Sequence, residues 1–150
     1  MKTIEGGAFA YCESLQTVET GGCETIGEQA FAFCPKLKSV TFGDNLQMIG
    51  SAAFLDHGMK EIRLPASLKG IGNSALYPMK PKSPLTVTVS GDVTENFHYA
   101  LFATAAGKII WPRKLTIKLS PGASAGAEKI RSYMAEYGIS EKEWKLVNEK

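Results

Sequence analysis

One pattern recurs along this chain about every 22 residues, and this recurrence restricts the fold to a repeat architecture. Each copy opens on an isoleucine, and successive copies open at Ile4, Ile26, Ile49 and Ile71. An alanine follows four residues later and precedes a phenylalanine or leucine, at positions 8, 30, 53 and 75. A unit this short cannot bury its own apolar face, whereas stacked units bury a continuous core. The sequence therefore predicts a solenoid.

Each unit has two parts with different periods. The first part, Ile-x-x-x-Ala-Phe, has a period near four and predicts a helical turn. The second part, Leu-x-x-Val-x-Phe, ends in alternation and predicts a short strand. The inward residues of these strands are Val18, Val40, Ile62, Val87 and Ile117. The last two steps widen to 25 and 30 residues, so the fourth and fifth units carry insertions. We expect Ala100-Leu101-Phe102 to supply the fifth Ala-Phe position.

The period changes after Gly122, where the repeats end. Ala123 to Tyr137 has apolar residues on one helical face, and Ser140 to Glu143 resembles a capping box that opens a second helix through Trp144. We expect both helices to cap the last coil, which no further repeat covers. The side chains expected near Ile117 and Leu119 are Tyr133, Met134 and Tyr137, with Trp144 closing the end. The predicted organisation is one domain, with a solenoid over 1–122 (tight repeats in 4–76, degenerate ones in 77–122) and a helical cap over 123–150.

Composition and charge exclude several classes of protein. A chain that is 44% hydrophobic and 21% charged is typical of a folded domain. Seventeen basic and fifteen acidic residues leave a net charge of +2, too small for a nucleic-acid partner. Residues 1–75 carry six basic and eight acidic side chains (−2), and residues 76–150 carry eleven and seven (+4). No apolar run approaches the roughly 20 residues of a membrane span, so we expect no membrane insertion. Met1-Lys2-Thr3 precedes no apolar leader segment, so a signal peptide is not expected in this chain.

The cysteines and histidines can be interpreted either as structural residues or as reactive groups. Cys12 and Cys34 occupy one column of the repeat, which predicts buried thiols, and a disulfide or redox pair is the alternative. Cys23 falls in a turn outside this column and is expected to be more exposed. His57 continues the column, so a nucleophilic pair with Cys34 is conceivable, but we favour a repeat substitution because no carboxylate orients the histidine. His98 lies in an insertion and is expected at the surface.

No spacing in the sequence matches a metal or phosphate site. The three cysteines and two histidines form no closely spaced ligand pairs, and no phosphate-binding loop motif occurs. The glycines Gly27, Gly50 and Gly72 recur with the repeat, which indicates tight turns or close packing between coils. We therefore predict a protein that is not an enzyme, with no catalytic residue, cofactor or metal.

The repeat Ile-Gly-x-x-Ala-Phe-x-x-Cys-x-x-Leu-x-x-Val-x-Phe resembles the BspA-type leucine-rich repeat. The chain end is also similar to that family's terminal cap, through Leu119, Pro121-Gly122, Tyr133, Trp144 and Val147. Departures are His57 and Leu76 at repeat positions and the stretched units four and five. The resemblance implies an α/β fold: a right-handed leucine-rich-repeat solenoid of about five units of 22–30 residues with a C-terminal helical cap. It also implies a bacterial or protozoan protein at the cell surface or secreted, which binds host or matrix proteins in adhesion.

Alternation along each strand turns the neighbours of the inward residues outward. Two outward columns result, one of Thr17, Ser39, Glu61, Thr86 and Thr116, the other of Glu19, Thr41, Arg63, Thr88 and Lys118. Solenoids use such surfaces to bind proteins, although strand propensity alone would also produce a solvated threonine ladder. The alternative function is a structural spacer that forms the C-terminal end of a longer array. In that case the uncovered first coil is expected to favour self-association.

Overall fold

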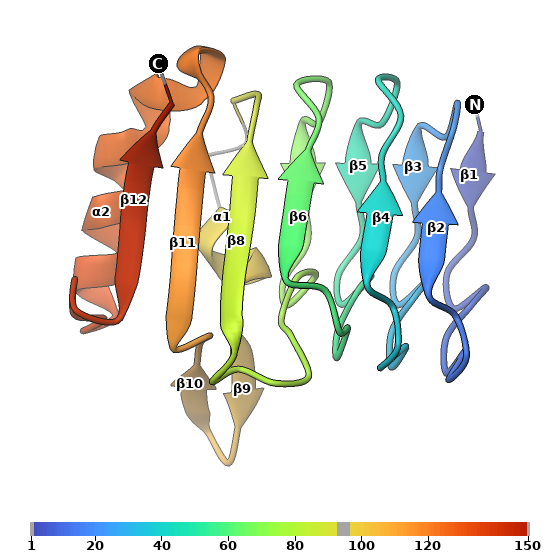
Figure 1. The fold of residues 1–150 in the computed structure, drawn as a ribbon, viewed down its shortest axis with the longest axis horizontal. Helices are drawn as coiled ribbons and strands as arrows, with labels where there is room; N and C mark the ends of the chain where they lie inside the picture. The colour runs from blue at the N-terminus through green and yellow to red at the C-terminus, as the bar shows by residue number, and fades with distance from the viewer. Residues whose placement is uncertain (1, 93–96, 150) are drawn as a thin grey trace.

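The computed structural model describes residues 2–92 and 97–149, in which short strands form two rows (Figure 1). The back row is one parallel sheet in the order β1-β3-β5-β7. Its strands are β1 (Thr3–Ile4), β3 (Thr25–Ile26), β5 (Met48–Ile49) and β7 (Gly70–Ile71). The strands of the front row are β2 (Thr17–Glu19), β4 (Ser39–Thr41), β6 (Glu61–Leu64), β8 (Pro84–Val89), β11 (Lys114–Leu119) and β12 (Trp144–Asn148). The chain thus passes from back to front once per repeat.

The register of the strands confirms the alignment of the repeats. In the back row each opening isoleucine pairs in parallel with its counterpart one coil away, as Ile4 does with Ile26. In the front row Val18 pairs with Val40, and Ile62 pairs with Val87, which in turn pairs with Ile117. Equivalent residues of successive units therefore lie directly above one another, and the core between the rows is continuous along the stack.

The segment between the two rows is not the helical turn predicted from its period of four. It is a series of turns in which non-glycine residues adopt the left-handed region at repeated columns, such as Gln29 and Phe33 with φ of 56° and 58°. Its amides bond to the adjacent coil rather than within a helix, for example from Phe31 N–H to the Ala53 carbonyl at 2.8 Å. Stacking supplies these partners, so the local period did not decide the structure.

Close approach of the coils explains the recurring glycines. A Cβ atom added at Gly27 or Gly50 would lie 2.5 Å from a backbone nitrogen of the preceding coil, and one at Gly72 would lie 2.3 Å away. No side chain fits at such distances, so these columns require glycine.

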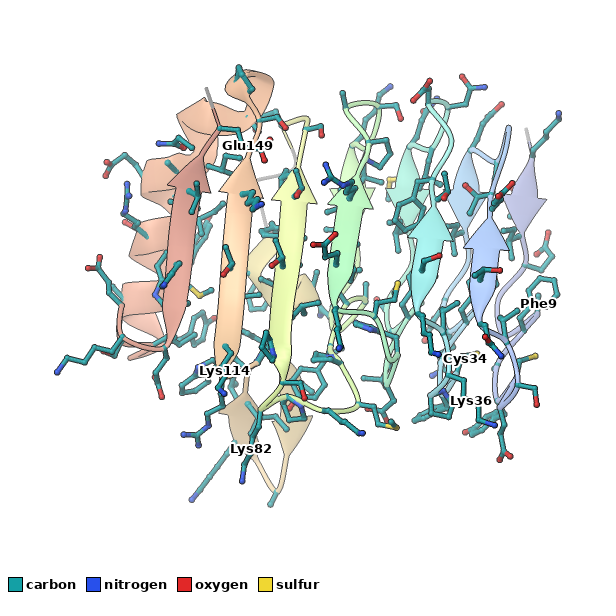
Figure 2. All side chains as sticks on the ribbon, in the orientation of Figure 1. Phe9, Cys34, Lys36, Lys82, Lys114 and Glu149 are labelled. Atoms are coloured by element: carbon teal, nitrogen blue, oxygen red, sulfur yellow. The ribbon has the colours of Figure 1, made fainter. Side chains whose placement is uncertain are left out.

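The phenylalanine column forms a ladder of stacked rings through the coils. Phe9, Phe31 and Phe54 stack with centroids 5.2 Å apart at each step, and Phe31 and Phe54 are buried. Phe9 lies on the outermost coil, where it is 45% exposed (Figure 2). The stacked rings end at Phe54, but the backbone pairing of this column continues into the degenerate units, because Leu76 N–H donates to the Ala100 carbonyl as Phe54 N–H does to that of Ala75. This pattern confirms Ala100 as the next member of the alanine column.

The insertions form local structure of their own. A four-residue helix, α1 (Phe97–Ala100), ends on the alanine position of the fifth unit. An antiparallel hairpin of β9 (Ala103–Ala105) and β10 (Lys108–Ile110) follows and projects below the lower edge of the stack (Figure 1).

The C-terminal segment differs from the two predicted helices. The first helix is shorter than Ala123 to Tyr137, because a 3₁₀ helix, Pro121–Gly126, precedes α2 (Ala127–Glu136). The second helix is wrong: Ser140 and the residues after it form a turn, and Trp144–Asn148 form strand β12, parallel to β11. The open edge of β11 offers hydrogen-bond partners that an isolated sequence window does not contain, and the strand satisfies them.

Some side chains of this segment cover the end of the stack as predicted, and others do not. Ile130, Met134 and Trp144 are buried in the same core as Ile117 and Leu119. Tyr133 and Tyr137 instead pack against His98 of α1.

Candidate functional site

The front row presents the two predicted outward columns in register. Glu61 pairs with Thr86, which pairs in turn with Thr116, and Arg63 pairs with Thr88, which pairs in turn with Lys118. The columns are exposed on β2, β4 and β6, but Thr86, Thr116 and Lys118 are half-buried. Thr88 is buried, contrary to the expectation of an exposed threonine, because it lies between the long side chains of Arg63 and Lys118.

The front row is not one continuous sheet. β4 pairs with β2, and β6 pairs with β8, but β4 and β6 are not hydrogen-bonded neighbours. The connection that leads into β6 is one residue short: Phe54 to Ile62 spans eight positions, whereas Phe31 to Val40 spans nine. We attribute the interruption to this shortening, since the back-row strands of the same units remain paired.

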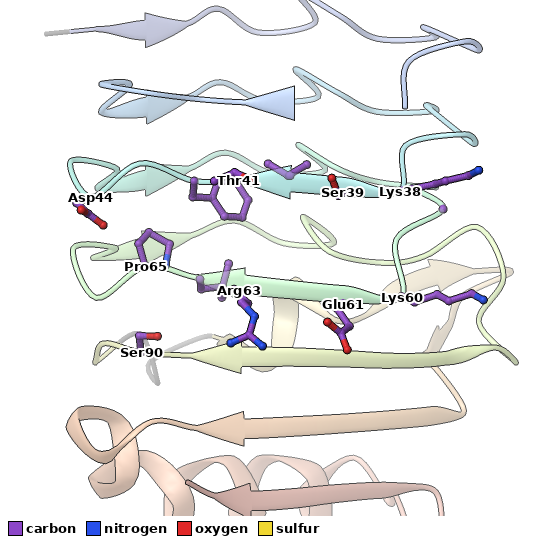
Figure 3. Close-up of a pocket in the computed structure, with 13 residues that line it drawn as sticks. Lys38, Ser39, Thr41, Asp44, Lys60, Glu61, Arg63, Pro65 and Ser90 are labelled. Atoms are coloured by element: carbon purple, nitrogen blue, oxygen red, sulfur yellow. The ribbon is translucent and has the colours of Figure 1, made fainter. Parts of the chain in front are cut away.

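A groove of about 810 Å³ lies where the sheet is interrupted (Figure 3). Apolar side chains that line it are Val40, Phe42 and Leu64. Val40 is half-buried, while its counterpart Ile62 on the next coil is buried, so the interruption leaves apolar surface accessible in the groove.

Charged side chains surround the groove. Lys38 and Lys60 lie at one end, beside the starts of β4 and β6, and Asp44 lies at the other end (Figure 3). Glu61 and Arg63 project from β6 between the two ends. The groove therefore combines an apolar floor with separated positive and negative ends, and facing strand edges flank it.

Sequence reasoning placed Glu61 and Arg63 on the binding face but missed the groove. Phe42 and Val40 were treated as ordinary repeat positions, and the unit that follows differed only in His57 and in the missing residue before Ile62. The deletion can be seen in the alignment of the repeats, but the alignment does not show that it interrupts the pairing of the strands.

Two of the three cysteines, Cys23 and Cys34, are buried, and Cys12 is half-buried. Cys12, Cys23 and Cys34 are all free thiols. The expectation that Cys23 is more exposed is wrong: it is 5% exposed, and its Sγ donates to the Thr25 carbonyl at 3.1 Å. The turn that contains it folds inward, since Cys23 N–H donates to the Thr20 carbonyl.

The hydrogen bonds of Cys34 and His57 are directed away from each other. Cys34 Sγ donates to the Phe9 carbonyl at 3.2 Å, and burial raises the pKa of this thiol. His57 Nδ1 accepts from Met59 N–H at 3.0 Å, so Nε2 carries the proton and donates to the Leu76 carbonyl at 3.0 Å. Both ring nitrogens are therefore engaged by the backbone, and neither is directed at a thiol.

The buried histidine His57 makes stability depend on pH. Burial lowers its pKa from 6.5 to about 4, although the hydrogen bond to the Leu76 carbonyl opposes the shift. The neutral ring is favoured in the folded state, so this stability is fully present above pH 6.5 and is lost as pH falls toward 4. We expect the free energy of unfolding to drop by about 3 kcal/mol over that interval, measured by urea titration at each pH.

The variant His57→Cys restores the residue that the repeat has in this column and serves as the control. It is expected to lose the contribution of His57 and to keep the smaller ones of His98, whose pKa burial lowers, and of Asp56, whose pKa burial raises. An equal slope in the variant and the parent protein would contradict the assignment to His57.

His98 is not a surface residue, contrary to the sequence-based expectation. It is 2% exposed, and its ring stacks on Tyr133 of α2 with centroids 4.0 Å apart. Tyr99 and Tyr137 extend the cluster through a hydroxyl–hydroxyl contact of 2.9 Å. The insertion that contains His98 packs beneath α2, so its lack of a repeat counterpart reflects contact with the terminal segment.

The described residues contain neither a cluster of three or more potential metal-ligating side chains nor a helix that combines the length and apolar character of a membrane span. The class of protein follows from the fold. Its short units are stacked, its equivalent strands pair in parallel and one strand face is open, which are the features of a leucine-rich-repeat protein.

Comparison with known proteins specifies the family. The profile of the BspA type leucine rich repeat region matches residues 1–119 in six copies. The chain belongs to this family, whose repeats typically serve protein interaction and are typically found at surfaces. Neither the curated proteins nor the solved structures include a match to the chain.

Proposed function

We propose that this chain is a non-enzymatic protein-binding module of a cell-surface or secreted adhesion protein, and that its repeats form a solenoid whose strand face contacts the partner. The observation that carries the proposal is the groove between β4 and β6. Family membership supports the general role, because repeats of this kind typically mediate protein interactions.

The groove has the composition of an anchoring site. Binding energy at protein interfaces concentrates in aromatic and arginine side chains within apolar, desolvated pockets. Phe42 and Arg63 supply these residue types here, around a floor that includes Val40 and Leu64. The edges of β4 and β6 also offer backbone groups to an extended segment, as in strand addition. The rest of the strand face is polar and threonine-rich, so the groove is its best candidate for an anchor.

Reversing the charges of the groove is expected to abolish partner capture. The double variant Glu61→Lys and Arg63→Glu conserves net charge and changes only exposed side chains. A lost hot spot costs at least about 2 kcal/mol, so we expect affinity to fall about thirtyfold or more. The measurement is capture from extracellular matrix extracts on the immobilised chain, followed by surface plasmon resonance with each captured protein.

The matched control is the double variant Glu128→Lys and Lys129→Glu on α2, whose side chains are also exposed and whose net charge is also conserved. Partners should bind this control as they bind the parent chain. Partners that bind the groove variant with unchanged affinity would exclude the groove as the site.

A structural role in stacking is the second candidate, and the first described coil favours it. Phe9 and Tyr11 are 45% and 69% exposed, and both stack only on rings of the following coil. The side of β1 and β2 that faces away from β3 and β4 has no strand neighbour among the described residues. Association through this coil would depend on Phe9 and Tyr11 and would be unaffected by the groove variant, which separates the two functions.

A further inference from the structure

Charge is segregated between the two rims of the stack. The lower rim consists of the turns that lead into the front strands, together with the β9–β10 hairpin (Figure 1). Figure 2 shows Lys36, Lys82 and Lys114 along this edge, and Figure 3 shows Lys38 and Lys60 at the same ends of β4 and β6. The basic side chains of this rim between positions 36 and 114 are Lys36, Lys38, Lys60, Lys80, Lys82, Lys108, Arg113 and Lys114.

Between positions 36 and 114, little negative charge offsets the basic rim. Asp56 is the acidic residue that the described turns contribute there, and burial raises the pKa of its carboxyl. The turns at the two ends of the stack add Glu5, Glu13, Glu28, Glu141 and Glu143, so the positive charge is concentrated in the middle of the rim. Arg113 has one acidic neighbour, Glu143, at 3.8 Å. The described residues of the opposite rim are mainly acidic, with Glu24, Asp44, Asp92 and Glu149 against Lys2 and Lys69. The net charge of +2 therefore conceals a basic section of the lower rim, between positions 36 and 114, opposite a mainly acidic rim.

A partly apolar pocket opens within the basic rim. Its volume is about 330 Å³, and Lys60 and Lys80 lie among its lining residues. The remaining walls are mostly proline, methionine and leucine side chains, namely Pro35, Met59, Pro78, Met79, Pro84 and Leu85. Proline has no backbone N–H, so these walls offer few backbone donors, and their apolar part accommodates an apolar side chain beside the polar groups of Ser83 and the lysines.

Exposed apolar side chains accompany the lysines elsewhere on this rim. Met79 at the pocket and Ile109 on the hairpin are both 40% exposed. The hairpin is tied to the pocket turn, since Arg113 N–H donates to the Pro81 carbonyl at 2.6 Å and Lys114 pairs with Pro84. The basic and apolar features therefore belong to one connected surface.

We propose that the lower rim binds an acidic, extended segment of a partner protein, with one apolar side chain of that segment in the pocket between Lys60 and Lys80. Carboxylates of the segment pair with the lysines, and its apolar side chain packs against the apolar walls of the pocket. A nucleic acid or a lipid headgroup complements the charge alone and leaves this pocket unfilled. The rim adjoins the strand-face groove and shares Lys38 and Lys60 with it, so the test uses residues that the groove does not contain.

The probe is a fluorescent peptide that repeats Glu-Asp-Leu, titrated against the full chain and followed by fluorescence anisotropy. We expect saturable binding that weakens with added salt, because the charges lie at the surface. The double variant Lys80→Glu and Lys82→Glu is expected to weaken binding about tenfold, since each exposed charge pair that is lost weakens binding by roughly threefold. The matched control, Lys69→Glu with Lys129→Glu, makes the same charge change away from the rim and should bind as the parent does.

Two further probes separate the chemistry of the ligand. A peptide with every leucine replaced by serine should bind at least about tenfold more weakly if a leucine occupies the pocket. Phosphatidylserine vesicles should bind no more tightly to the parent than to the Lys80→Glu, Lys82→Glu variant. Any one of four results would overturn the proposal. Two concern the peptides: the leucine peptide fails to bind, or the serine peptide binds equally well. Two concern the lysines: the rim variant binds with unchanged affinity, or vesicle binding depends on these lysines. None of these results bears on the groove variant, which leaves Lys80 and Lys82 in place.

Discussion

A chain that ends after Gly122 is expected to be insoluble or to aggregate. This truncation removes α2 and β12, and with them the buried side chains of Ile130, Met134 and Trp144. Each large apolar side chain contributes roughly 1.5–3 kcal/mol when buried, while a domain is stable by only about 5–15 kcal/mol. The truncation also leaves β11 as an unpaired edge strand, which favours intermolecular pairing. Soluble yield and thermal unfolding by circular dichroism measure the effect.

Removal of only Glu149 and Lys150 is the matched control. Within the described residues it costs one terminal hydrogen bond, from Glu149 N–H to the Leu119 carbonyl, worth about 1 kcal/mol. This shorter deletion should leave a soluble, cooperatively folding protein. If the long truncation melted at the parent temperature, the terminal segment would have no role in the stability of the repeats.

The substitution Phe54→Ala is expected to destabilise the fold by about 3–5 kcal/mol. The ring is fully buried, stacks on Phe31 at 5.2 Å and meets the edge of Phe42 at 5.7 Å. Its removal opens a cavity in the centre of the stack, which neighbouring coils cannot fill because their backbones are hydrogen-bonded to one another. Urea titration of the parent and the variant measures the change.

Phe9→Ala is the control for the same column, because Phe9 has the same stacking geometry but is nearly half exposed on the outer coil. We expect it to cost about 1 kcal/mol, since less apolar surface is lost from the interior. Equal losses at Phe9 and Phe54 would mean that position along the stack does not determine stability.

The contrast between these variants follows from the quasi-one-dimensional construction of repeat proteins. Each coil contacts only its neighbours, so an inner coil is covered on both sides and an outer coil on one. The terminal segment covers the other end of the stack through Ile130 and Trp144, both of which lie in the continuous core.

The repeat register could be read from the sequence because it depends on spacing alone. Ile4, Ile26, Ile49 and Ile71 pair as their steps predict, and the outward columns follow from strand alternation. The close packing of the coils at Gly27, Gly50 and Gly72 could also be predicted from the sequence, since a glycine that recurs with the repeat indicates a position where no side chain fits.

The errors arose where contacts between distant segments override a local pattern. Ser140 to Glu143 has the composition of a helix start, yet the residues after it form β12 because β11 offers an open edge. Cys23 and His98 were assigned to the surface from local context, and both are buried by segments that fold over them. The period-four segment forms turns because amides such as Phe31 N–H find partners on the next coil.

The period, the register and the inward-facing residues could be predicted from the sequence, because each is a property of one unit repeated along the chain. The places where this regularity ends could not be predicted in the same way: the break between β4 and β6, the groove that it opens, and the lysines along one rim all depend on contacts between coils. Lys38, Lys60, Lys82 and Lys114 are far apart in the sequence, and stacking brings the turns that carry them to the same edge. The physical reason is that hydrophobic spacing is a local quantity, whereas pairing across coils and surface charge are sums over segments that only the folded chain places together.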